Sequence, residues 1–126
     1  ESVFKLMEPH FFQPFLEEKI EVPLITSLAQ LKNVLTFSRG PVLVDFFAEY
    51  CPSCMRMLPA VASVGAQFEG KATFVKVDVE QAQEIAQEYH VGAIPVMLVF
   101  KDGQVVARYN EAMSRKELVD FTQQFI

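Results

Sequence analysis

The two cysteines of this chain lie close together, in the segment CPSC at positions 51–54. Two thiols separated by two residues can hold a metal ion, form a structural disulfide, or act as a pair that exchanges disulfides. A bond across two residues closes a loop too short to stabilise a fold much. A structural zinc site usually needs four nitrogen or sulfur ligands, and only His10 and His90 are available to complete one. Both observations favour a redox pair.

The predicted elements on either side of the pair indicate how it would work. Residues 42–48 (VLVDFFA) are apolar at successive positions, as in a strand covered on both faces. Residues 55–68 indicate a helix interrupted by Pro59, which we expect to kink it. At the start of a helix, N–H groups lack partners and the dipole is positive, so the pKa of Cys51 should fall and its thiolate should attack. The i, i+3 spacing lets Cys54 then attack a mixed disulfide formed by Cys51.

Length and composition limit the class of protein. The chain has 126 residues, of which 51% are hydrophobic and 21% charged, which suits one globular domain. The net charge is −5 and the 11 basic residues are scattered, which argues against binding to nucleic acid. The apolar runs are short and the N-terminal stretch is interrupted by charges, so we expect no membrane span.

The remaining elements follow from periodicity, capping residues and turn signals. Ser27 with Gln30, and Ser114 with Glu117, have the spacing of helix capping boxes, and the Asp-Gly pair at 102–103 indicates a hairpin turn. In chain order we expect a short helix near 11–18, an edge strand at 20–25 weakened by Pro23, a helix from 27 to 38, a strand at 72–79, a helix at 82–89, strands at 96–100 and 105–109, and a final helix from 114. This order predicts an α/β fold with a mixed sheet and helices on both faces.

From residue 20 onward the sequence resembles the thioredoxin family, and from Val42 to the end the correspondence has no gap. VLVDFFAEYCPSC is similar to that family's strand and active-site turn, and YHVGAIPVMLVFKDGQVV to its later loop, strand and hairpin. Several positions match at their expected separations: Asp45, Cys51, Cys54, Pro59, Lys76, Pro95 and Gly103. The resemblance implies a thioredoxin fold over residues 19–126, preceded by an N-terminal extension at 1–18 that has no counterpart in a minimal thioredoxin.

The resemblance also implies roles for the catalytic residues. Cys51 matches the nucleophilic cysteine and Cys54 the buried cysteine that resolves the mixed disulfide. Asp45 matches the buried acid that assists proton transfer at the second sulfur, and a carboxyl inside an apolar strand should have a raised pKa. Lys76 matches the lysine that approaches this acid. A structural hydrogen-bonding role for Asp45 and a surface position for Lys76 are the alternatives.

A substrate-binding surface is implied next to the cysteines. Ile94-Pro95 matches the family's cis-proline loop, although only about one X–Pro bond in twenty is cis in general. The backbone of Ile94 would pair with an extended substrate chain. Three departures from the family affect this surface and the redox potential: Phe47 and Tyr50 stand where the family has tryptophan, Pro52-Ser53 replaces Gly-Pro, and Glu111 replaces a glycine at the groove edge. The expected substrate-binding residues are Tyr50, Pro52, Ser53, Ile94, Pro95 and Glu111.

The sequence therefore predicts a thiol–disulfide oxidoreductase that needs no cofactor or metal beyond the Cys51–Cys54 pair. Its expected partners are protein disulfides and a reductase or oxidase that resets the pair, and the Phe-rich extension could form a homodimer. A non-catalytic interaction module is the alternative function. Because the chain begins with Glu1 and a Phe-rich stretch, we expect an extracytoplasmic or periplasmic location, including tethering to a membrane, with a cytoplasmic location as the alternative.

Overall fold

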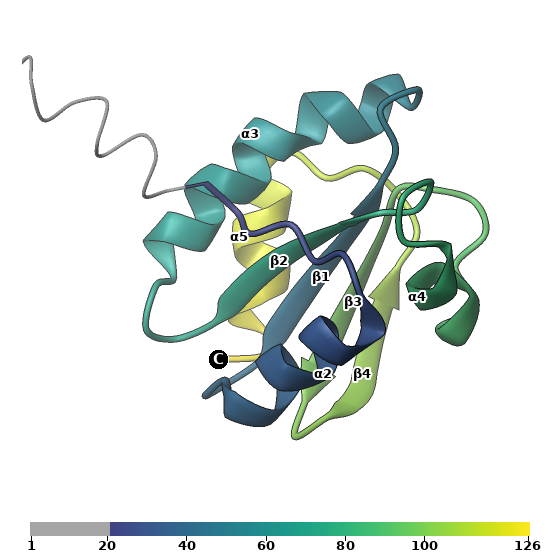
Figure 1. Cartoon of the computed structure of the whole chain (residues 1–126). Helices are drawn as coiled ribbons and strands as arrows, with labels where there is room; N and C mark the ends of the chain where they lie inside the picture. Colours follow the sequence, from purple (N-terminus) through teal and green to yellow (C-terminus); the bar gives the residue numbers. More distant parts are fainter. Residues whose placement is uncertain (1–20) are drawn as a thin grey trace, which may run out of the picture.

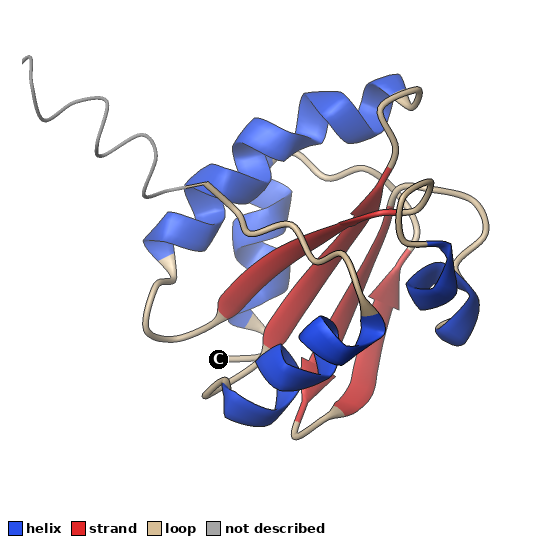
Figure 2. Ribbon diagram, viewed as in Figure 1, coloured by secondary structure: helices blue, strands red, loops and turns tan. Residues whose placement is uncertain are grey.

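The computed structural model describes residues 21–126. Their four strands are β1 (Val42–Phe47), β2 (Thr73–Asp78), β3 (Val96–Lys101) and β4 (Gln104–Tyr109). The sheet order is β2-β1-β3-β4, with β1 parallel to β2 and antiparallel to β3, and β3 antiparallel to β4 (Figure 2). The predicted mixed sheet is therefore confirmed. The expectations for residues 1–18, including the helix near 11–18 and the homodimer, lie outside the described residues.

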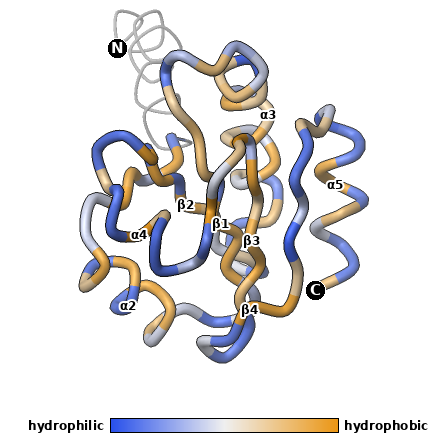
Figure 3. The backbone as a smooth tube through the Cα atoms, turned by 90° about the vertical axis from the view of Figure 1, so that its right-hand side faces the viewer, coloured by the Kyte–Doolittle hydropathy of each residue, from blue (hydrophilic) through white to orange (hydrophobic). Residues whose placement is uncertain are grey.

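Helices cover both faces of this sheet, as predicted. Helices α3 (Pro52–Gln67) and α5 (Arg115–Gln123) lie on one face, and α2 (Leu28–Phe37) and α4 (Gln83–Glu88) lie on the other (Figure 1). The hydropathy of the backbone follows these layers: the central strands are hydrophobic, whereas α5 alternates between hydrophobic and hydrophilic residues (Figure 3). This alternation is typical of a helix with one buried face.

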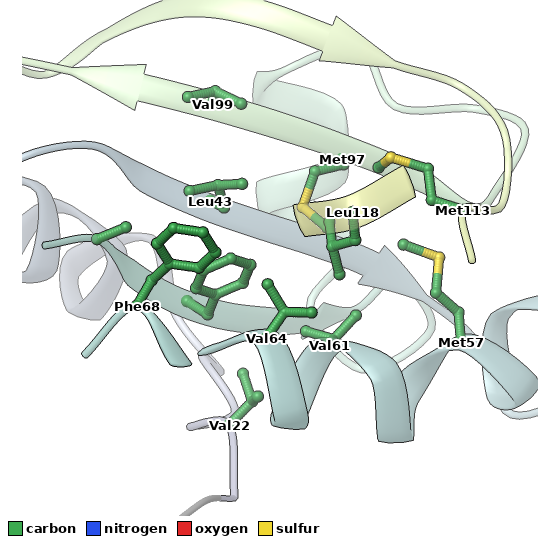
Figure 4. Close-up of a cluster of buried hydrophobic side chains, with 12 residues drawn as sticks. Val22, Leu43, Met57, Val61, Val64, Phe68, Met97, Val99, Met113 and Leu118 are labelled. Atoms are coloured by element: carbon green, nitrogen blue, oxygen red, sulfur yellow. The ribbon is translucent and has the colours of Figure 1, made fainter. Parts of the chain in front are cut away.

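Each face of the sheet has its own hydrophobic core. Val44 and Phe46 of β1 pack into the core beneath α2 and α4, whereas Leu43 packs into the core with α3 and α5 (Figure 4). Successive side chains of a strand point to opposite faces. Asp45 therefore lies on the same face as Leu43, under α3.

Two predictions about individual elements were wrong: the strand at 20–25 and the interruption of the helix at Pro59. Of the strand predicted at 20–25, the described residues 21–25 form none: Leu24 makes only an isolated parallel bridge to Lys76 at the edge of β2. The Lys76 N–H donates to the Pro23 carbonyl at 3.0 Å, but Pro23 itself has no N–H to extend the ladder. The helix after the cysteines starts at Pro52 and continues through Pro59 without interruption. Burial of Val61 and Val64 in the core stabilises it despite the proline.

The predicted caps and the hairpin turn are largely confirmed. Ser114 and Glu117 form a complete capping box at the start of α5. The Ser27 hydroxyl accepts from the Gln30 N–H at 3.1 Å, but the Gln30 side chain accepts from Thr26 and not from Ser27, so this box is only half formed. In the hairpin, Asp102 and Gly103 have φ values of 53° and 78°, the conformation for which Asp-Gly is preferred.

Candidate active site

The cysteine pair lies where β1 gives way to α3. The Cys51 N–H donates to the Ala48 carbonyl at 3.1 Å, which closes the turn after the strand. Cys51 is the N-cap of α3, and its sulfur accepts from the Cys54 N–H at 3.3 Å. Pro52 is the first helical residue, where its missing N–H removes no helical bond. The predicted position of the pair at a helix start is confirmed.

The two sulfurs differ in accessibility. Cys51 and Cys54 are joined by a disulfide with their Cα atoms 5.3 Å apart. Cys51 is half-buried, whereas Cys54 is 1% exposed. The Ser53 hydroxyl lies 3.5 Å from the Cys51 sulfur. In the reduced state, hydrogen bonds from the Cys54 N–H and the Ser53 hydroxyl would stabilise a thiolate at Cys51. Cys51 also carries the sulfur that a substrate can reach.

Asp45 is a buried acid with an unusual pKa. It is 2% exposed, and its Oδ2 has no hydrogen-bond partner among the described residues. Burial raises the pKa of Asp45 from 3.8 to about 7, against an opposing effect of the Lys76 charge. A carboxyl group with this pKa can both accept and release a proton near neutral pH.

Lys76 is the cation whose charge opposes the raised pKa of Asp45. It stands beside Asp45 in the register of β1 and β2, so both side chains lie on the α3 face. Lys76 is half-buried, with its Nζ 5.9 Å from the centroid of the Phe47 ring. Among the described residues, the only ion pair joins Lys116 and Asp120. Lys76 therefore affects the pKa of Asp45 through its charge and not through a direct ion pair.

Three loops meet at the edge of the sheet that carries the disulfide. Phe46, near the end of β1, pairs with Val96 at the start of β3, and Met97 pairs with Tyr109 at the end of β4. The turn at 48–51, the loop ending at 95 and the loop at 110–114 therefore leave the same edge (Figure 1). The Ile94–Pro95 bond is cis, as predicted.

The predicted substrate-binding residues are exposed to different degrees. Tyr50 is 68% exposed. The others range from exposed (Pro52 and Glu111) through half-buried (Ser53 and Ile94) to buried (Pro95).

A cavity beside the disulfide contains residues that sequence reasoning missed. Its volume is about 280 Å³, and it is lined by Ser53, Arg56, Met57, Ala112, Met113 and Ser114, but not by Glu111. Positions 53, 56 and 57 have i, i+3 and i+4 spacing and so share one face of α3. That spacing was the signal for Arg56 in the sequence.

Within residues 21–126, no group of three or more His, Cys, Asp or Glu side chains is placed to hold a metal ion. In the same range, no helix is both long enough and apolar enough to cross a membrane. His90 is exposed and directly follows the last turn of α4, with a φ of 57°.

The sequence model of the thioredoxin family matches residues 22–124. A thioredoxin C-2 from Corynebacterium nephridii is 41% identical over 86 residues, which cover 68% of this chain and 80% of that protein. A thioredoxin from Haemophilus influenzae is 34% identical over 98 residues, covering 78% and 92%. The solved structure of Fasciola hepatica thioredoxin aligns with a TM-score of 0.77 at 29% identity, covering 83% of this chain and 100% of that one. The chain therefore belongs to the thioredoxin family and is a thiol–disulfide oxidoreductase.

Proposed function

We propose that this oxidoreductase reduces disulfides in extended segments of other proteins, with Cys51 as nucleophile, Cys54 as resolving thiol and Asp45 as proton acceptor. One observation carries the proposal: a helix-start disulfide has one accessible and one buried sulfur, and a buried acid lies on the sheet face beneath that helix. The pKa of this acid, Asp45, is raised to about 7. In this arrangement the accessible Cys51 attacks the substrate disulfide, and the buried Cys54 then resolves the mixed disulfide.

The reaction begins from the reduced pair. The Cys51 thiolate attacks one sulfur of the substrate disulfide; a bond forms between the two sulfurs, and the other substrate sulfur leaves as a thiolate that takes up a proton. Cys54 then attacks the Cys51 sulfur, which expels the second substrate thiol and leaves the Cys51–Cys54 disulfide. The substrate gains two electrons and two protons: the cysteine pair supplies both electrons and the Cys54 proton, and solvent supplies the other proton because Cys51 reacts as a thiolate.

In the second step, Asp45 accepts the proton of the buried Cys54 thiol. Cys54 is 1% exposed, so solvent has little access to its thiol proton, and a thiol must lose that proton to attack. Asp45 is buried on the face of β1 that α3 covers. Its pKa of about 7 makes its carboxylate a matched base for this proton near neutral pH.

Docking of the substrate uses the edge where the three loops meet. A chain that pairs with the backbone beside Ile94 adds a strand-like segment next to the disulfide, and the exposed Tyr50 ring offers it apolar contact. Glu111 is exposed in the loop at 110–114, where its charge should disfavour acidic segments that pass over it. A protein reductase would return the Cys51–Cys54 disulfide to the dithiol.

The role of Asp45 is tested by the kinetics of an Asp45→Asn variant. Because Asn cannot accept the proton, we expect release of the mixed disulfide at pH 7 to slow by about 10²-fold, the lower end of the usual range for general base catalysis. Attack by Cys51 on a peptide disulfide should keep its rate. Stopped-flow measurements with a quenched peptide disulfide separate the two steps. Equal release rates in the variant and the wild type would assign Asp45 a structural role.

A further inference from the structure

We propose that the cavity lined by Arg56 binds an acidic side chain of the substrate, close to the cysteine that Cys51 attacks. This inference rests on the proposed function, because the cavity acts on specificity only when a peptide disulfide docks at the pair. It assigns Arg56 as a residue that determines which disulfides are preferred.

One wall of the cavity lies next to the reacting sulfur. Ser53 lines it, and the Ser53 hydroxyl lies 3.5 Å from the Cys51 sulfur. A group bound there is therefore a neighbour of the substrate cysteine in the same peptide. The volume of about 280 Å³ lies below the range of about 300–1,000 Å³ for sites that bind drug-sized ligands. The cavity suits one side chain better than a whole small molecule.

The N–H donors of the Arg56 guanidinium are available to bind a ligand. It is exposed, and its guanidinium makes no hydrogen bond or ion pair within residues 21–126. In contrast, Arg108 donates to the carbonyls of Tyr89 and His90 at 3.1 and 2.9 Å, and Arg115 donates to Ser63 and Gln67, both at 3.1 Å. The planar guanidinium presents two parallel N–H groups that match a carboxylate.

The other walls of the cavity suit the methylene groups of an acidic side chain. Met57 and Met113 are 4% and 5% exposed and lie near each other in the core between α3 and α5 (Figure 4). They supply apolar surface below the charged group. Arg56 and Ser53 both belong to the first turns of α3, where the positive end of the helix dipole also favours an anion.

Among the described residues, Arg56 is the only cationic side chain that lines this cavity, and the charged residues nearby are held elsewhere or lie outside it. The Glu117 carboxylate accepts from the Ser114 N–H at 2.8 Å and is thereby held at the start of α5. Lys116 pairs with Asp120 at 3.1 Å, farther along the same helix. Glu111 is exposed and stands one residue before the cavity wall. Its charge repels acidic residues near the loop at 110–114, so a preference for a substrate carboxylate has to come from Arg56.

The test uses two symmetric peptide disulfides that differ only in the residue next to cysteine, Glu in one and Gln in the other. The rate constant for reduction of each by the pre-reduced protein is measured at low salt. An ion pair of this exposure should favour the Glu peptide by about two- to fivefold, and Arg56→Gln should bring the ratio to about one. Arg39→Gln is the matched control, because Arg39 is exposed before β1, at the opposite edge of the sheet, and its loss changes the net charge equally.

Each outcome decides a separate question. Loss of the preference in Arg56→Gln but not in Arg39→Gln supports the inference, particularly if the rate with the Gln peptide is unchanged. If wild type shows no preference, or both variants lose it alike, the assignment of Arg56 is wrong while the proposed function stands. If neither peptide is reduced by the wild type, the proposed function is wrong and the inference goes with it.

Discussion

Asp45 lies in the middle of β1, on the face of the sheet that α3 covers. Its pKa is raised from 3.8 to about 7 by burial, so ionisation costs more in the folded protein than in the unfolded chain. Between about pH 4 and pH 7 the native state keeps a proton that the unfolded state has released. The wild type should therefore lose stability as pH rises through this window and level off above it.

An Asp45→Asn variant removes this dependence. From pH 4 to pH 8, the wild type should lose up to about 4 kcal/mol more of its free energy of unfolding than the variant does. Each unit of pKa shift corresponds to about 1.4 kcal/mol. Urea unfolding of the oxidised proteins at both values measures the difference. Parallel stability curves for the two proteins would show that the carboxyl of Asp45 is not perturbed.

Cys51 should be the more acidic thiol of the reduced pair. Its place as the N-cap of α3, with the Cys54 N–H directed at its sulfur, stabilises the thiolate, whereas burial of Cys54 disfavours one. Alkylation of the reduced protein between pH 5 and pH 9, followed by peptide mapping, should label Cys51 first. Preferential labelling of Cys54 would reverse the assignment of nucleophile and resolving thiol.

At the scale of elements, the sequence predicted best where local signals agree. The Asp-Gly hairpin and the Ser114 capping box are specified by a few neighbouring residues, so they could be predicted without tertiary information. The segment at 20–25 could not, because pairing depends on β2, some 50 residues away in the chain, and Pro23 limits that pairing. The start of α3 at the cysteine pair was predicted, but the continuity of the helix through Pro59 was not, because it depends on burial of Val61 and Val64 in the core.

The capping box gives the start of α5 a measurable share of the stability. A Ser114→Ala variant loses the bond from the Glu117 N–H to the Ser114 hydroxyl, which should cost about 1 kcal/mol. Lys116→Gln in the same helix is the control; its ion pair with Asp120 is highly exposed and should contribute little. Thermal unfolding distinguishes the two variants. Similar stabilities would mean that packing of residues such as Leu118 holds α5 without help from the cap.

At the scale of the molecule, the sheet topology explains why distant residues form one site. The ends of β1 and β4 and the start of β3 lie at one edge, so loops separated by up to 60 residues meet around the disulfide. A cavity of about 370 Å³ lies at the opposite edge, between α2 and the β3–β4 turn, and plays no part in this chemistry. The burial of Asp45 and Cys54 and the cis bond before Pro95 agree with what the resemblance implied. The cavity next to Ser53 could not be predicted, because it depends on how α3 packs against the loop before α5.

The packing of the Phe-rich segment 1–18 stays a prediction from the sequence. Its phenylalanines would form an unusually apolar surface unless they pack on this domain or on a second copy. A variant lacking residues 1–18 should therefore have a lower melting temperature or a different oligomeric state. Calorimetry and light scattering on the full chain and the shortened one measure both quantities. Identical values would identify the segment as a tail or linker.

Trapping of the mixed disulfide tests the central claim most directly. Without Cys54, the adduct that Cys51 forms with a substrate has no internal thiol to resolve it and should persist. A reduced Cys54→Ser variant, mixed with a peptide disulfide and analysed by intact mass, should carry one peptide on Cys51 that is lost on adding reductant. A Cys51→Ser variant should carry none. If Cys54→Ser captures no peptide while its Cys51 still reacts with an alkylating agent, this chain does not act by the proposed exchange.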